Sequence, residues 1–130
     1  MECMHRMKRV AWLAAGPLLL ALLALAPAQP LAAAELLQTS GQLALLRVHA
    51  LGSKYGPPQD QIDVEVVVKL ANQPDKAFGF QLRDDAQGPV RRAMLDIMRD
   101  AFAQNWTVTI DYFLDPGKQN GIVHRVWVVK

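Results

Sequence analysis

Cysteine is almost absent from this 130-residue chain, which holds only Cys3. Since that residue lies close to the N-terminus, the rest of the chain forms no internal disulfide bond and offers no thiolate for catalysis or metal binding. His49 and His124 have no histidine, cysteine or carboxylate at metal-ligand spacing, so no metal site is predicted. Glycine-rich phosphate loops and nucleophile-elbow motifs are missing as well. The sequence therefore predicts a protein that is not an enzyme and that needs no cofactor.

An excess of charge of either sign is also missing from most of the chain. The full sequence has 14 Lys and Arg against 12 Asp and Glu, and three of the basic residues and one acidic residue lie before residue 10. This leaves 11 of each in residues 35–130. A neutral domain lacks the basic surface that nucleic-acid binding requires, so we expect no nucleic-acid partner.

The first segment has the pattern of a secretory signal. Lys8 and Arg9 precede an apolar run over residues 10–26, and three small residues, 32–34, precede Glu35. We expect cleavage after Ala34, which leaves residues 35–130 as a single periplasmic or secreted domain with no membrane attachment. The alternative is an uncleaved membrane anchor, because the run approaches the roughly 17–20 residues that span a bilayer.

Alternation of apolar and polar residues predicts five short strands. In the clearest of them, Asp63, Glu65 and Lys69 occupy the polar face and Val67 is the exception. Turn-forming residues separate the strands, and the second and third strands are expected to form a hairpin. The predicted strands are 43–51, 62–70, 78–83, 106–114 and 122–129, with turns at 52–58, 72–75 and 115–121.

A single helix is predicted over residues 89–104, between the third and fourth strands. Asp84, Asp85 and Pro89 favour a helix start there. The residues expected to face the core at helical spacing are Val90, Ala93, Met94, Ile97 and Ala101.

The apolar surface of this helix is wider than one sheet face needs. Leu95, Met98 and Phe102 extend it to a second side, which predicts a docking face for another envelope protein. The alternative is a helix that its own domain buries on more than one side.

The order strand, strand, strand, helix, strand, strand predicts a mainly β domain. It fits the five-stranded Greek-key barrel called the OB-fold, whose helix would plug one open end. The alternative is an α+β sheet with the helix packed across one face.

A family resemblance covers the helix and the last two strands, residues 91–102, 106–110 and 122–127. These segments resemble the B subunits of pentameric bacterial enterotoxins of the cholera-toxin type. The resemblance implies a secreted OB-fold that assembles into a homo-oligomeric ring and binds cell-surface glycans. The chain lacks the paired cysteines of many of those subunits and matches none of their glycan-binding residues, so the resemblance implies no particular site.

OB-folds bind ligands on the face of strands two and three and through the first and last long loops. Tyr55 is the leading candidate there, because an aromatic ring in a Gly/Pro-rich loop can stack on a sugar or a peptide side chain. Its alternative role is an anchor for the loop against the barrel rim. By the OB-fold analogy, the candidate ligand-binding residues are Lys54, Tyr55, Gln81, Arg83, Lys118 and Asn120.

Three classes of function follow from these patterns. The favoured one is an exported binding module for a glycan, a peptide or a small ligand, as a monomer or a homo-oligomer. The second is an envelope accessory protein that docks through its helix. The third, and least favoured, is a small enzyme with a site built from Asp111, His124 and Arg125.

Overall fold

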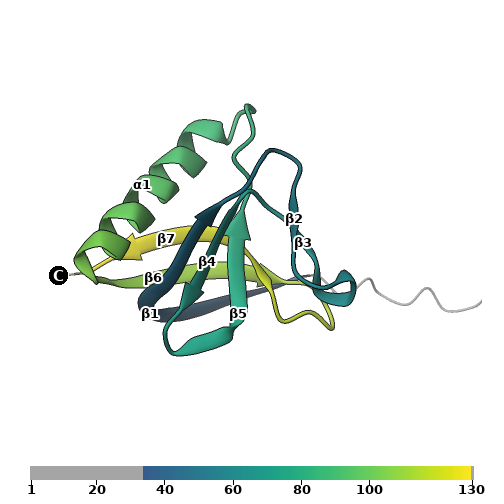
Figure 1. Ribbon diagram of the computed structural model, residues 1–130, viewed down its shortest axis with the longest axis horizontal. Helices are drawn as coiled ribbons and strands as arrows, with labels where there is room; N and C mark the ends of the chain where they lie inside the picture. The colour runs from purple at the N-terminus through teal and green to yellow at the C-terminus, as the bar shows by residue number, and fades with distance from the viewer. Residues whose placement is uncertain (1–33, 130) are drawn as a thin grey trace, which may run out of the picture. The chain divides into compact units, whose positions relative to one another are not determined.

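Five strands close into a ring in the computed structural model, which describes residues 34–129 (Figure 1). The predicted signal segment lies outside the described residues, apart from Ala34 at its end. Around the ring the order is β1, β4, β5, β7, β6, and all neighbours are antiparallel except β5 and β7, which are parallel. The ring strands are β1 (Glu35–Val48), β4 (Val66–Leu70), β5 (Gln73–Phe80), β6 (Thr107–Leu114) and β7 (Gly121–Val128).

The remaining elements lie between the ring strands. The helix α1 (Gly88–Gln104) connects β5 to β6. The loop between β1 and β4 holds the short strands β2 (Lys54–Tyr55) and β3 (Ile62–Asp63), which pair with each other, and a 3-10 turn, η1 (Pro58–Asp60). For residues 34–129, the predictions of a mainly β domain with a single α-helix are confirmed, and the ring strands follow the predicted order around the helix, with β2 and β3 as unpredicted additions.

Strand β1 begins eight residues earlier than the predicted start at residue 43. Its first half, Glu35 to Gln42, pairs with β6, and its second half pairs with β4 after a bulge between Leu43 and Leu45. The first half is not clearly patterned in the sequence, and the distant strand β6 stabilises it as a strand. The single long strand β1 therefore joins β6 to β4 and closes the ring.

The predicted strand over 62–70 is broken at Val64 and Glu65. Residues on either side form β3 and β4, and the prediction that Glu65 lies on a polar face is wrong, because its exposed fraction is 1 %. Strand β5 also differs from the prediction: it begins at Gln73, within the predicted turn, and ends at Phe80. Its ladder stops there because the Leu82 N–H donates to the Glu65 carboxylate instead of to a strand partner.

Two apolar clusters explain the burial pattern. The main core fills the inside of the ring and includes Val66, Val68, Leu70, Phe78 and Phe80. The second cluster lies on the outer side of β4 and β5, beneath the loop of residues 49–65, which we call the first loop. Its buried members are Ile62, Val64, Val67 and Ala77.

The second cluster accounts for Val67, the exception in the predicted polar face. Val67 points outward from β4 but has an exposed fraction of 0 %, because the first loop covers it. Gly79 on β5 has no room for a side chain: a Cβ there would lie 2.6 Å from Val64 Cγ2. The first loop therefore packs directly onto the backbone of the strands below it.

The helix packs against β1, β6 and β7 through a face that agrees with the predicted one in part (Figure 1). The predicted residues Met94, Ile97 and Ala101 contact the main core. Met94, Met98 and Ala101 are buried in the main core, whereas Val90 and Ala93, predicted to face the core, are exposed. Within the described residues, no helix is long and apolar enough to span a bilayer.

The predicted docking face on the helix is corrected as a result. Met98 has an exposed fraction of 0 %, and Leu95 packs against the main core, so neither offers a free surface to a partner. Only Phe102, which is 44 % exposed, keeps the predicted accessibility. Most of the predicted docking face is therefore used by the domain itself.

Because the first loop covers Val67, we expect its truncation to reduce stability more than truncation of the exposed Val48. We expect Val67→Ala to lower the free energy of unfolding by about 2 kcal/mol, because two methyl groups leave a closed apolar site. Val48→Ala, at a site that is 55 % exposed, should change it by less than about 0.5 kcal/mol. Urea unfolding of both variants measures this, and equal effects would show that the first loop does not cover Val67.

Candidate functional site

The first loop is tied to the loop of residues 115–120, which we call the last loop. Asp60 Oδ1 accepts hydrogen bonds from the backbone N–H groups of Gln119 at 2.8 Å and Asn120 at 3.0 Å. Asn120 Nδ2 donates to the Asp60 carbonyl at 2.9 Å, and Lys118 Nζ donates to the Gln61 carbonyl at 2.9 Å. These bonds form a bridge between two loops that are far apart in the sequence.

Gly56 makes this bridge possible. It has a φ of 102°, which favours glycine. A Cβ at Gly56 would lie 2.7 Å from the Asp60 carbonyl oxygen and 2.8 Å from Asn120 Nδ2. The glycine therefore allows the backbone of the first loop to approach the bridge closely.

Asn120 and Lys118, both predicted to bind ligand, are engaged within the fold. Asn120 is 5 % exposed, and its Oδ1 accepts a hydrogen bond from the Ala77 N–H at 2.9 Å. Lys118 is partly buried and also forms an ion pair with Asp115 at 3.5 Å. Sequence reasoning placed these residues in the correct loop but could not show that their polar groups hold the two loops together.

Glu65, at the C-terminal end of the first loop, holds this loop in place through hydrogen bonds. Its carboxylate accepts hydrogen bonds from the backbone N–H groups of Gly52 at 2.9 Å and Leu82 at 2.8 Å, and from Arg83 Nη2 at 3.3 Å. Burial alone would raise the pKa of Glu65, but these three donors outweigh it and hold the pKa below its ordinary value of 4.5. The side chain thus remains ionised near neutral pH.

Arg83 and Gln81 complete this arrangement. Arg83 Nη2 also lies 2.7 Å from Asp63 Oδ1, and Gln81 Nε2 donates to the Asp63 carbonyl at 3.2 Å. These two predicted ligand residues therefore bind β3, in the first loop, to the segment that follows β5. Lys54, on the paired strand β2, remains exposed.

Two hollows flank the bridge between the loops. The first hollow has a volume of about 600 Å³ and lies between the first loop, the last loop and the β4–β5 hairpin. The second hollow, of about 410 Å³, lies toward the start of α1 and includes Gln81 and Lys118. Polar and aromatic side chains that line the first hollow are Tyr55, Gln59, Asp60, Lys69, Asp75, Gln119 and Asn120.

The predicted ligand residues are thus divided between the hollows. Tyr55 and Asn120 line the first, Gln81 and Lys118 line the second, and Lys54 and Arg83 line neither. The first hollow is also lined by residues outside the predicted set, namely Lys69, Asp75, Gln59 and Gln119. Lys69 had a usable signal, because it was the polar residue of the second strand on the face that OB-folds use.

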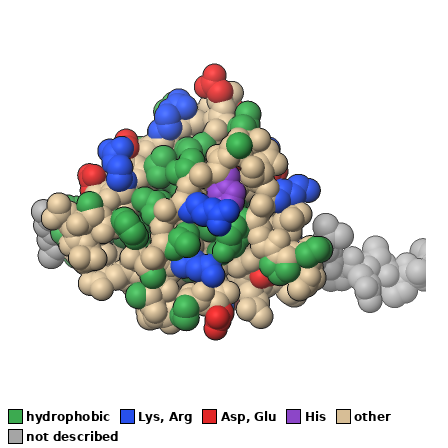
Figure 2. Space-filling model, viewed as in Figure 1, with side chains coloured by type: hydrophobic (Ala, Val, Ile, Leu, Met, Phe, Trp, Pro, Cys, Tyr) green, Lys and Arg blue, Asp and Glu red, His purple; other side chains and the backbone are tan. Residues whose placement is uncertain are grey.

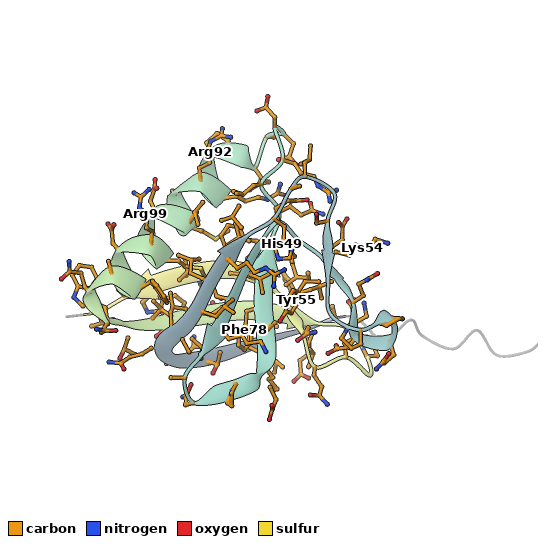
Figure 3. The ribbon with its side chains drawn as sticks, viewed as in Figure 1. His49, Lys54, Tyr55, Phe78, Arg92 and Arg99 are labelled. Carbon is orange, nitrogen blue, oxygen red and sulfur yellow. The ribbon has the colours of Figure 1, made fainter. Side chains whose placement is uncertain are left out.

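Tyr55 lies between the second cluster and the first hollow, a position compatible with both roles considered for it. Its ring packs against the second cluster and also lines the hollow. The ring meets the edge of the His49 ring with 6.0 Å between centroids, and Arg47 Cζ lies 5.9 Å from the Tyr55 centroid (Figure 3). The ring is therefore held in place at the wall of the hollow.

The third function class rests on Asp111, His124 and Arg125. The structure pairs two of these residues: Arg125 donates to Asp111 Oδ2, at 2.8 Å from Nε, and Gln38 Nε2 donates to Oδ1 at 2.9 Å. The hydrogen bonds from Gln38 and Arg125 lower the pKa of Asp111, so its carboxylate is a weak base. His124 instead packs its ring against Phe113, with 5.1 Å between centroids.

No group of three or more His, Cys, Asp or Glu side chains that could hold a metal ion occurs in residues 34–129. Comparison with protein-family models, curated proteins and solved structures finds no match.

Loss of the Glu65 charge should weaken the fold in a pH-dependent way. Because its pKa is lower in the folded state, Glu65 stabilises the fold above its ordinary pKa of 4.5 and loses this effect as the pH falls through the lower folded value. We expect Glu65→Gln to lower the free energy of unfolding at pH 7 by at least about 2 kcal/mol, because hydrogen bonds to charged groups contribute about 1.5–3 kcal/mol each.

Urea unfolding between pH 7 and pH 3 checks this expectation. The wild-type protein should lose more stability on acidification than Glu65→Gln, with a slope difference of up to about one proton. Asp84→Asn, which removes an exposed carboxylate, is the control and should follow the wild type. Identical pH profiles of Glu65→Gln and the wild type would contradict the role given to Glu65.

Proposed function

We propose that this chain is an exported, non-enzymatic OB-fold module that binds an oligosaccharide in the first hollow. The strand order supports the OB-fold assignment: five strands close into a ring, and the only α-helix in residues 34–129 lies between the third and fourth ring strands. The basic residues, apolar run and small residues at the N-terminus support export.

The position of the first hollow carries the proposal. It lies between the first and last long loops, beside the strands β4 and β5, and these correspond to the loops and strands that OB-folds use for ligands. Its volume of about 600 Å³ is within the range of small-ligand sites, about 300–1,000 Å³.

The lining favours a sugar over the other ligand classes. A sugar ring presents an apolar face and a rim of hydroxyl groups, which match the Tyr55 ring and the amide groups of Gln59 and Gln119. OB-folds also bind oligonucleotides, but the neutral charge of residues 35–130 argues against a polyanion. The helix-docking alternative is weakened because Met98 is buried.

Removal of the Tyr55 ring should reduce binding. A panel of immobilised oligosaccharides identifies a ligand, and titration calorimetry measures its affinity. We expect Tyr55→Leu, which keeps apolar packing against the second cluster, to weaken binding by at least about tenfold, or about 1.4 kcal/mol. Tyr55→Phe should bind nearly as well as the wild type, because it keeps the ring.

Trp127→Ala is the matched control, since it removes an aromatic ring from another hollow, one lined by residues of β1 and β7. It should leave the affinity unchanged, and unfolding curves verify that each variant is folded. The proposal fails when no oligosaccharide in the panel binds, or when Tyr55→Leu binds as tightly as the wild type.

Export can be tested separately from binding. When the full chain is expressed in a bacterium, we expect the mature protein in the periplasmic or extracellular fraction. Its intact mass should equal that of a chain that begins at Glu35. Ala34→Leu should slow this cleavage, because the cleavage site requires small residues. Recovery of the uncleaved chain from the membrane fraction would instead establish the anchor.

A further inference from the structure

We propose that the oligosaccharide carries a carboxylate group, as a uronic acid does, and that Arg47 and Lys69 bind this group beside Tyr55. This inference rests on the proposed function, because it specifies the chemical class of ligand for the same hollow.

Arg47 and Lys69 lie on one sheet face. Arg47 on β1 is opposite Val67 on β4, and Leu45 is opposite Lys69. Val67 and Leu45 pack into the second cluster outside the ring, so the side chains two residues away along each strand point to the same side. Diagonal neighbours of this kind are about 7–8 Å apart, which long side chains can span.

Neither cation is neutralised within residues 34–129. Arg83, Arg91, Arg99, Lys118 and Arg125 all form ion pairs with carboxylates, whereas Arg47 and Lys69 form none. Lys54, Lys76 and Arg92 also form none, but only Lys69 among the lysines lines the first hollow, and Arg47 contacts the Tyr55 ring. Lys69 Nζ donates only to the carbonyl of Pro74, at 3.0 Å. Figure 2 shows basic side chains next to a histidine in the middle of this face. The charges therefore remain available to an external anion.

The two cations stand beside the site rather than on a remote surface. Lys69 lines the first hollow together with Tyr55, and Arg47 lies over the Tyr55 ring at 5.9 Å from the centroid. A sugar ring held against Tyr55 thus has cationic groups within reach of a substituent. Arginine and lysine bind carboxylates through charge-assisted hydrogen bonds, which are stronger than neutral ones.

The acidic side chains near the hollow limit how much negative charge a ligand can carry. Asp60 uses Oδ1 to accept two backbone hydrogen bonds, and Glu65 is buried against Arg83. Asp75, however, lines the hollow near Lys69 and would repel a second anionic group. Isolated carboxylates on an otherwise neutral saccharide fit this arrangement better than a densely sulfated or phosphorylated polymer.

The test compares acidic oligosaccharides with their own carboxyl-reduced derivatives. The probes are a xylotriose and a cellotriose that each carry a single glucuronate substituent, each paired with the same compound after reduction of the carboxyl group to an alcohol. We expect the acidic form of at least one pair to bind the full-length protein at least about tenfold more tightly at low salt. The difference should shrink as ionic strength rises, because salt screens exposed charges.

Two variants test whether Arg47 and Lys69 cause the preference for the acidic form. Arg47→Gln and Lys69→Gln should each reduce the ratio of acidic-form to reduced-form affinity, because a charge-assisted hydrogen bond to the carboxylate is lost. Arg92→Gln removes an exposed cation from α1, away from Tyr55 (Figure 3), and should keep the full difference. Arg47→Lys should restore part of it.

The outcomes separate this inference from the proposed function. Equal binding of acidic and reduced forms overturns the carboxylate inference and leaves oligosaccharide binding in place. A preference for the acidic form that persists undiminished in both Arg47→Gln and Lys69→Gln also overturns it. When no acidic, reduced or neutral oligosaccharide binds, both the inference and the proposed function fail.

Discussion

The buried carboxylate of Glu65 fixes the first loop to the ring, and the rest of the site depends on this attachment. It accepts hydrogen bonds from Gly52 near one end of the loop and from Leu82 after β5. The cost of burying a charge is offset because three donors surround it, two of them backbone groups of otherwise irregular segments. Loss of this attachment would release the loop from the strands that it covers.

With the loop in place, most of the outer face of β4 and β5 is buried. In an OB-fold this face would be expected to meet ligand, but here Ile62 and Val64 cover Val67 and Ala77. The accessible part of the face is reduced to its edge, where the first hollow lies between the two loops. The covering loop therefore moves the candidate site from the strands to the loop junction.

Charge is distributed differently on the two sides of β1. On the side of β6 and β7, Asp111 and Arg125 form a pair, so the charges compensate one another within the protein. On the side of β4, Arg47 and Lys69 have no acidic partner in residues 34–129, although the sequence as a whole contains nearly equal numbers of acidic and basic residues. Two cations without an ion pair therefore lie beside the Tyr55 ring, although Asp60 and Asp75 line the same hollow as Lys69.

The sequence by itself determined the element order, because local patterns carry that information. The helix over Gly88–Gln104 and the strands over Thr107–Leu114 and Gly121–Val128 lie within one residue of the predicted bounds. In these elements, the spacing of apolar residues along the chain reflects which side of the helix or strand faces the core. Local context also indicated Tyr55, an aromatic residue in a loop rich in glycine and proline, and this residue lines the first hollow.

Only the tertiary structure decided which polar residues are free to bind a ligand. Asn120, Lys118, Gln81 and Arg83 were candidates because they are polar and lie in the expected loops, but their partners are Asp60, Gln61, Asp63 and Glu65, which come from a different part of the chain. Glu65 was assigned to solvent because alternation places it opposite the apolar face, and no local pattern reveals the distant donors that bury it. Hydrogen bonds between residues far apart in sequence leave no periodic signal, so the free cations Arg47 and Lys69 could be distinguished from the engaged ones only after the chain had folded.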